Sequence, residues 1–150
     1  MSHSHNARYR SAVEVPSGRC EGVRFLVERM SFGRRLELIR ELKGLLGRME
    51  YLAAGPQGPE QQAEAALVAG EIDRIYLRWG LREIAGLEID GAPATPETLA
   101  ERGPEELVEE VLEAIRREAG LRETERKNSG SPSISTDGAR PDGSATIAAG

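Results

Sequence analysis

The sequence predicts a mostly helical α+β fold, namely a small helical bundle with one or two short β-hairpins and a disordered C-terminal tail. The 150-residue chain is 39% hydrophobic and 30% charged but only 4% aromatic, which is typical of a helix-rich domain built on aliphatic side chains. Several segments carry apolar residues at helical spacing, and short segments alternate as strands do. We expect a flexible N-terminus over residues 1–11, a single domain over 12–120 and a disordered tail over 121–150.

Two short strands are predicted near the N-terminus, over SAVEVP and GVRFLVERM. In the second, Val23, Phe25 and Val27 alternate with other residues, which is typical of a strand with one buried face. Leu26 interrupts the alternation, which favours a hairpin at the edge of a sheet.

A long helix is predicted after Ser31, a residue type that favours the N-cap. Its apolar positions recur every four and three residues on one face: Leu38, Leu42, Leu45, Met49 and Leu52. Ile39 and Leu46 are expected to widen this buried face. Gly44 and Gly47 each weaken a helix by up to about 1 kcal/mol relative to alanine, unless they mark a close helix–helix contact.

A second helix is predicted from Pro59, which suits a first helical turn, to Trp79. One side of it is apolar: Val68, Ile72, Ile75, Tyr76 and Trp79. The linker AGPQGP between the two helices is short, so they are expected to pack as an antiparallel pair.

The segment REIAGLEIDGAPAT is predicted to form a hairpin, because Asp90-Gly91 can supply the two positive φ angles of a type I′ turn. Pro93 restricts its strand to an edge. Thr95 is then a good N-cap for a short helix that ends at Gly103.

The last helix is predicted from Pro104 to about Ala119, with Gly120 as its stop. Glutamates crowd its first turns and two arginines its last turn, as the helix macrodipole favours. Its apolar stripe has five members: Leu107, Val108, Val111, Leu112 and Ile115.

Charge is unevenly distributed along the chain, whose net charge is −5. Residues 1–58 hold ten Arg or Lys and six Glu, residues 59–120 hold six Arg and fifteen Asp or Glu, and residues 121–150 hold four of each sign. The basic and acidic parts are expected to attract each other, within a chain or between copies. The acidic majority argues against nucleic acid as the main partner.

The sequence predicts no catalytic residue, metal site or cofactor. His3 and His5 lack the further ligands of a stable metal site. Cys20 would need a general base to act as a nucleophile, and the only histidines lie in the N-terminus. Glu71 and Asp73 diverge on a helix. No apolar run approaches the roughly 20 residues of a membrane span, and the N-terminus lacks the apolar core of a secretion signal. Since the single cysteine, Cys20, cannot form an internal disulfide, a reducing cytoplasm is expected.

Two features favour a binding role. Arg35 and Arg40 belong to an arginine-rich first helix that suits phosphates. The glutamates interleaved with these cations argue against nucleic acid, and the cations equally suit an acidic protein partner or the acidic half of the molecule itself. Tyr76 and Trp79 suit either the core or a partner anchor.

The stretch YLRWGLREIAGLEIDGAPATPETLAERGPEELVEEVLEAI resembles the tail assembly chaperones of long-tailed bacteriophages. It has their order of an aromatic helix end, a short strand, an acidic-Gly turn, a Pro-Thr segment and a closing helix. The upstream GVRFLVERMSFGRRLELIRELKGL is similar to their opening strand and basic amphipathic helix. The resemblance covers about residues 15–127 and rests on structural residues rather than on a catalytic signature.

The resemblance implies a non-enzymatic chaperone, of phage or prophage origin, that binds the tape measure protein. It would keep this long helical chain soluble in the host cytoplasm while tail tube subunits polymerise around it, and it would leave the finished virion. Tail tube subunits are a further implied partner, and self-association stays open. A frameshifted longer product is also implied, with Lys127-Asn128 as a hypothetical slip site.

We expect the partner to contact the helix pair, and the basic side of the first helix to tune orientation and association rate. The candidate contact residues are Leu42, Leu45, Met49, Ile72, Tyr76, Trp79, Arg35 and Arg40. The alternative hypothesis is a small nucleic-acid-binding regulator that uses the arginine-rich first helix.

Overall fold

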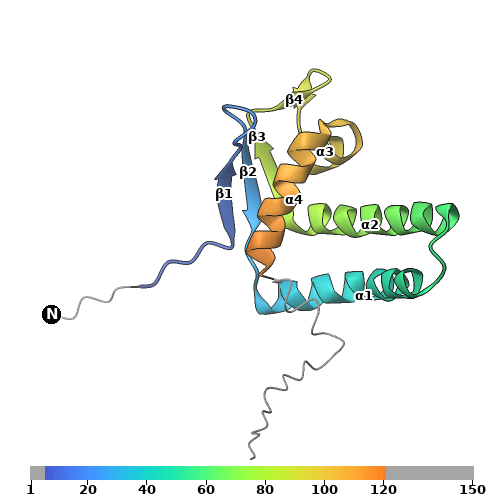
Figure 1. The fold of residues 1–150 in the computed structure, drawn as a ribbon. Coiled ribbons are helices and arrows are strands. Elements are labelled where there is room, and N and C mark those ends of the chain that lie inside the picture. Colours follow the sequence, from blue (N-terminus) through green and yellow to red (C-terminus); the bar gives the residue numbers. More distant parts are fainter. Residues whose placement is uncertain (1–5, 121–150) are drawn as a thin grey trace, which may run out of the picture. The chain divides into compact units, whose positions relative to one another are not determined.

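The computed structural model describes residues 6–120. Within them, four helices accompany small antiparallel sheets of three and two strands, so the predicted mostly helical α+β class is confirmed (Figure 1). The elements in chain order are β1 (Ala12–Pro16), β2 (Arg24–Glu28), α1 (Phe32–Ala54), α2 (Pro59–Gly80), β3 (Leu81–Ala85), β4 (Glu88–Ile89), β5 (Ala92–Pro93), α3 (Pro96–Arg102) and α4 (Glu105–Ala119).

The three-stranded sheet has the order β1-β2-β3, and α4 packs against β2. Phe25 and Val27 are fully buried, and they pair with Val15 and Val13 of β1, so the predicted alternation is confirmed. β2 is nevertheless the central strand rather than part of an edge hairpin. The reason is that β3, from a distant part of the sequence, pairs with its other side.

The segment predicted as one hairpin divides into two parts. β3 joins the larger sheet, and the β4–β5 hairpin alone contains the turn at Asp90-Gly91, with φ of 54° and 82° as a type I′ turn requires. Gly86 separates the two parts, because its φ is 80° and an added Cβ would lie 2.1 Å from the carbonyl oxygen of Gly22. The chain therefore turns out of the sheet at that glycine. Pro93 lies in an edge strand, as predicted.

Helices α1 and α2 pack side by side as the predicted antiparallel pair, which we call the arm (Figure 1). Ser31 caps α1, since its hydroxyl oxygen accepts a hydrogen bond of 3.3 Å from the amide of Arg34. At the other end, the side-chain amide of Gln57 donates to the carbonyl oxygens of Leu52 and Gly55. Both ends of α1 thus have satisfied backbone groups.

The face of α1 toward α2 carries what we call the inner stripe: Leu38, Leu42, Leu45, Met49 and Leu52. The expectation that Ile39 and Leu46 widen this buried face is wrong, because their side chains are 48% and 40% exposed. Gly44 and Gly47 do not mark a contact within the described residues, since an added Cβ at either meets nothing within 4 Å.

Helix α2 passes into β3 without a loop, because it ends at Gly80 and the strand begins at Leu81. An added Cβ at Gly80 would lie 2.4 Å from Cγ2 of Ile115 in α4, and Ile115 is fully buried. Glycine at this position therefore allows α4 to approach the end of α2 closely enough to contact both the arm and the sheet.

The last two helices begin and end at the predicted signals. Thr95 and Thr98 form a reciprocal capping box at the start of α3, and Gly103 ends it. Pro104 is the N-cap of α4, and Gly120 ends that helix in the left-handed conformation with φ of 63°. These local signals fix where α4 can lie on the sheet.

Gly80→Ala should destabilise the domain, because its new methyl group overlaps Ile115 and overpacking typically costs about 1–3 kcal/mol. Gly44→Ala is the matched control. Its methyl group meets open space in a helix interior, so it should raise the free energy of unfolding by up to about 1 kcal/mol. Urea unfolding followed by circular dichroism measures both, and equal effects of the same sign would contradict the close contact.

Candidate partner-binding surface

Helix α1 carries a second apolar stripe on a side that no element between residues 6 and 120 covers. Phe32, Leu36, Ile39 and Leu46 have exposed fractions of 82%, 45%, 48% and 40%. With Lys43 they recur every four and three residues, so they share one face of the helix. We call these five residues the outer stripe.

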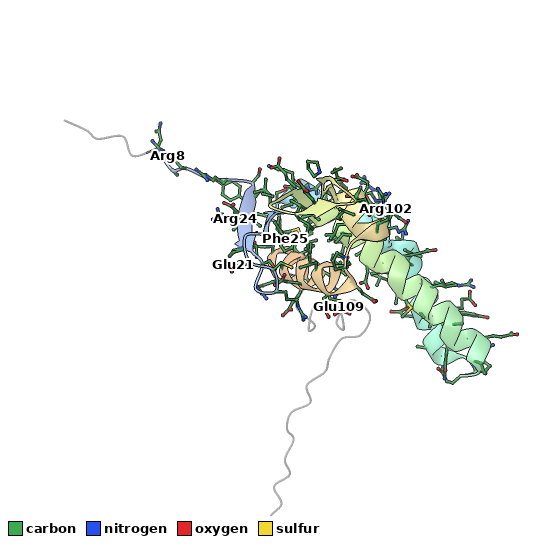
Figure 2. All side chains as sticks on the ribbon, turned by 90° about the horizontal axis from the view of Figure 1, so that it is seen from above. Arg8, Glu21, Arg24, Phe25, Arg102 and Glu109 are labelled. Carbon is green, nitrogen blue, oxygen red and sulfur yellow. The ribbon has the colours of Figure 1, made fainter. Side chains whose placement is uncertain are left out.

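Each residue of the outer stripe lies six positions before the corresponding residue of the inner stripe. Because each residue turns the helix by about 100°, the two stripes lie about 120° apart around it. One stripe can pack on α2 while the other stays accessible. Figure 2 shows the arm extending beyond the sheet and α4, with side chains projecting from its surface. Isolated exposed apolar residues are common, but four in one row mark a surface for interaction.

Cations border the outer stripe. Arg35 lies four residues before Ile39 and Arg40 four residues after Leu36, so they flank the stripe on its two sides. Within residues 6–120, Arg35, Arg40 and Lys43 have no ion pair. Their charge is therefore available to a partner.

Arg34 and Trp79 join the start of α1 to the end of α2. The indole nitrogen of Trp79 donates to the carbonyl oxygen of Arg34 at 3.1 Å, and the guanidinium of Arg34 donates to the carbonyl oxygen of Trp79. The guanidinium also lies 4.8 Å from the centroid of the indole ring and pairs with Glu37 at 3.1 Å. Trp79 is thus a structural residue of the arm, at its base.

The structure separates the residues predicted to contact a partner. Four lie in the core with at most 7% exposed: Leu42, Ile72, Tyr76 and Trp79. Leu45, Met49 and Arg35 are half-buried, and Arg40 is exposed. The buried four offer no surface to a partner in this conformation. Tyr76 instead packs against Arg116, whose guanidinium carbon lies 5.6 Å from the centroid of the tyrosine ring.

Sequence reasoning missed Phe32 and Leu36 as surface residues. The signal that could have found them is the spacing itself, because Phe32, Leu36, Ile39 and Leu46 form a second helical row distinct from the first. Placing Ile39 and Leu46 in the inner stripe concealed that row.

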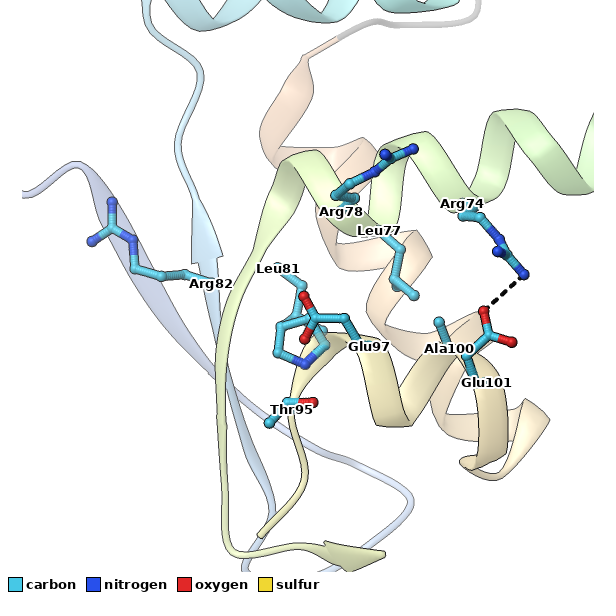
Figure 3. A pocket seen from close by; sticks show the side chains of 10 residues that line it. Arg74, Leu77, Arg78, Leu81, Arg82, Thr95, Glu97, Ala100 and Glu101 are labelled. Atoms are coloured by element: carbon cyan, nitrogen blue, oxygen red, sulfur yellow. Dashed lines mark ion pairs between the residues drawn. The ribbon is translucent and has the colours of Figure 1, made fainter.

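A pocket of about 630 Å³ lies where α2, β3 and α3 meet (Figure 3). The ion pair between Arg74 and Glu101, at 2.9 Å, lies at this pocket, and Leu77 contributes an apolar wall. Arg82 is held by the carboxylate of Glu28 on β2 through contacts of 2.6 and 2.9 Å. The lining includes no histidine or cysteine, and its polar groups also include the hydroxyl of Thr95 and the carboxylate of Glu97.

The basic part, residues 1–58, and the acidic part, residues 59–120, contact each other at several points within the chain. Arg19, in the loop between β1 and β2, lies 4.0 Å from the carboxylate of Glu106 in α4. In the same loop the hydroxyl of Ser17 and the amide of Gly18 donate to the carboxylate of Glu110, at 2.6 and 2.7 Å. Arg48 of α1 pairs with Glu64 of α2. These contacts fasten the β1–β2 loop to α4 and the two helices of the arm to each other.

In the described part of the chain, His, Cys, Asp and Glu form no group of three or more that could hold a metal ion. Asp73 pairs with Arg116 of α4 rather than with Glu71, and His3 and His5 lie outside the described residues. None of the helices between residues 6 and 120 is long and apolar enough to cross a membrane.

Comparison of the chain with protein-family models, with curated proteins and with solved structures finds no match.

Arg34→Ala should loosen the base of the arm, because it removes the cation–π contact and a hydrogen bond while leaving the Trp79 bond to the backbone in place. We expect a loss of about 1–3 kcal/mol in unfolding free energy. Emission from Trp79, the single tryptophan, should shift to longer wavelength. Arg40→Ala, an exposed arginine without an ion pair, should change stability by less than about 0.5 kcal/mol, and a similar loss in both variants would refute the role of Arg34.

Proposed function

We propose that this protein is a non-enzymatic assembly chaperone that binds a long helical protein, the tape measure protein of a long-tailed phage or prophage. The observation that carries the proposal is the outer stripe, an exposed apolar row on a helical arm. The sequence resemblance to phage tail assembly chaperones supplies the identity of the partner.

The physical task of such a chaperone is to cover apolar surface on another chain. A long helical protein exposes apolar rows before assembly, and contiguous exposed apolar surface drives aggregation. A helix face with a matching row can cover it by side-by-side packing. The arm supplies that face, while the sheet and α4 keep the arm folded when no partner is bound.

The same proposal places the protein in the cytoplasm of a bacterial host and outside the finished virion, and it adds tail tube subunits as a further partner. The hypothetical slip site at Lys127-Asn128 and the tail over 121–150 lie outside the described residues. The nucleotide sequence tests the slip site, because codons without an A-rich slippery run would remove it.

The second candidate, a nucleic-acid-binding regulator, is favoured by one observation. Arg35, Arg40 and Lys43 lie on one helix without ion pairs within the described residues. Phosphate binding would use these cations but would leave the outer stripe without a role, so the chaperone explains more of the surface.

Co-expression with the tape measure protein tests the proposal directly. The soluble fraction of the tape measure protein should rise several-fold when this chain is present, because its exposed rows are covered. An unrelated soluble protein expressed at the same level is the control. A soluble fraction unchanged by this chain would count against the chaperone.

Salt dependence separates the two candidates. Binding to nucleic acid should weaken steeply between low and physiological salt, since counterions are released from the phosphates. Binding through the outer stripe should weaken far less, because burial of apolar surface is not screened. Fluorescence anisotropy with duplex DNA and with the tape measure protein, each at several salt concentrations, measures both. Tight salt-sensitive binding to DNA alone would favour the regulator.

A further inference from the structure

We propose that the outer stripe binds one amphipathic helix of another protein, whose apolar residues recur every four and three residues and whose flanking positions are Asp or Glu. This deepens the proposed function by stating the chemistry of the partner segment, and it rests on that function only for the identity of the partner.

The spacing of the outer stripe determines how apolar residues must be arranged on the helix that binds it. The stripe from Phe32 to Leu46 offers four apolar side chains over about four helical turns. A helix with the same repeat can place its own apolar residues between them along this length, whereas a strand, with side chains alternating every second residue, cannot. Lys43, within the stripe, can lay its methylene groups along a bound helix and keep its ammonium group in water.

The acidic part of the occupant follows from charge. Helix α1 carries five cations against three glutamates, a net charge of +2: Arg34, Arg35, Arg40, Lys43 and Arg48 against Glu37, Glu41 and Glu50. Arg34 and Arg48 are already paired with Glu37 and Glu64. The unpaired Arg35 and Arg40 flank the stripe, so carboxylates on both edges of a bound helix would meet them.

A second copy of this chain does not fit the stripe. Pairing α1 with α1 would bring two helices of net charge +2 together. Helix α4 is acidic, but its apolar side chains are used in the core: Leu107, Val111, Leu112 and Ile115 are at most 5% exposed.

The remainder of the same chain does not fit either. Residues 121–150 contain three large aliphatic residues, Leu121, Ile134 and Ile147, which are thirteen positions apart and cannot form a row with spacing of four and three. Their charges cancel, with four of each sign. Charge and spacing therefore favour a helix from a different protein as the occupant.

Two synthetic peptides of about 21 residues, three heptads long, test the inference. They share one leucine stripe, and one carries Glu at the flanking positions where the other carries Lys. Isothermal titration calorimetry with the full chain should detect binding of the Glu peptide and at least about tenfold weaker binding of the Lys peptide. Equal affinity for the two peptides, or binding of neither, would overturn the proposal.

Variants of the full chain locate the contact. Replacing Phe32, Leu36 and Ile39 together by serine should weaken binding of the Glu peptide by at least about tenfold. Leu67→Ser is the matched control, since Leu67 is 71% exposed but lies on α2. The affinity of this variant for the Glu peptide should equal that of the wild type. Circular dichroism confirms that each variant is folded, and undiminished binding by the folded triple variant would refute the stripe as the site.

A charge-reversed variant tests the flanks without altering the apolar row. Arg35→Glu combined with Arg40→Glu should reverse the preference, so that the Lys peptide binds more tightly than the Glu peptide. An unchanged preference would contradict the assigned role of the two arginines.

Sedimentation equilibrium and a competition assay test the other occupants. Wild-type protein should remain monomeric, and a dimer abolished by the triple serine variant would show that a second copy occupies the stripe. Duplex DNA should not displace the Glu peptide at physiological salt. Displacement by DNA would favour the nucleic-acid regulator instead.

Together, the peptide and co-expression assays distinguish a failure of this inference from a failure of the proposed function. If wild type solubilises the tape measure protein and the triple serine variant does so equally well, this inference is wrong, and the chaperone acts through a surface other than the outer stripe. If the Glu peptide binds as expected but the tape measure protein is not solubilised, the inference stands and the proposed partner is wrong.

Discussion

The contact between Gly80 and Ile115 determines how the arm meets the sheet. Helix α2 continues directly into β3, so no linker absorbs an error in direction. Ile115 comes so close to the backbone at Gly80 that a single methyl group there would overlap it. Because α4 also packs on β2, this one close approach ties helix, strand and sheet into one packed unit. The base of the arm is therefore packed against α4, and Trp79 adds a hydrogen bond to α1.

The same arrangement leaves α1 with one main neighbour. α2 covers the inner stripe, and α4 and the sheet are engaged with α2 and with each other. A helix with apolar residues on two sides and a neighbour on one side must expose the other row. Burying an exposed side chain such as Phe32 in a contact is favourable by about 25 cal/mol for each Å² of apolar surface removed from water. Burial of the exposed row in a contact would therefore be favourable.

Much of the fold could be predicted because its signals are local. Ser31, Thr95 and Gly120 mark helix ends through contacts with residues close in sequence, and the type I′ turn needs only Asp90 and Gly91. The pairing of β3 with β2 joins residues 54 to 61 positions apart, and no local signal specifies it. The sequence analysis did not identify the outer stripe for a related reason. Both stripes of α1 have the same spacing, and only long-range packing decides which one α2 covers.

The seven-residue repeat of the outer stripe has a geometric consequence. Two turns of an α-helix take about 7.2 residues, so a row that recurs every seven drifts slowly around the helix with a left-handed sense. A helix that follows such a row crosses its neighbour at about 20° and winds gently around it. The row from Phe32 to Leu46 spans about 21 Å. If the stripe binds a long helical chain as proposed, successive copies bound to one face of that chain would lie no closer than about 14 residues apart.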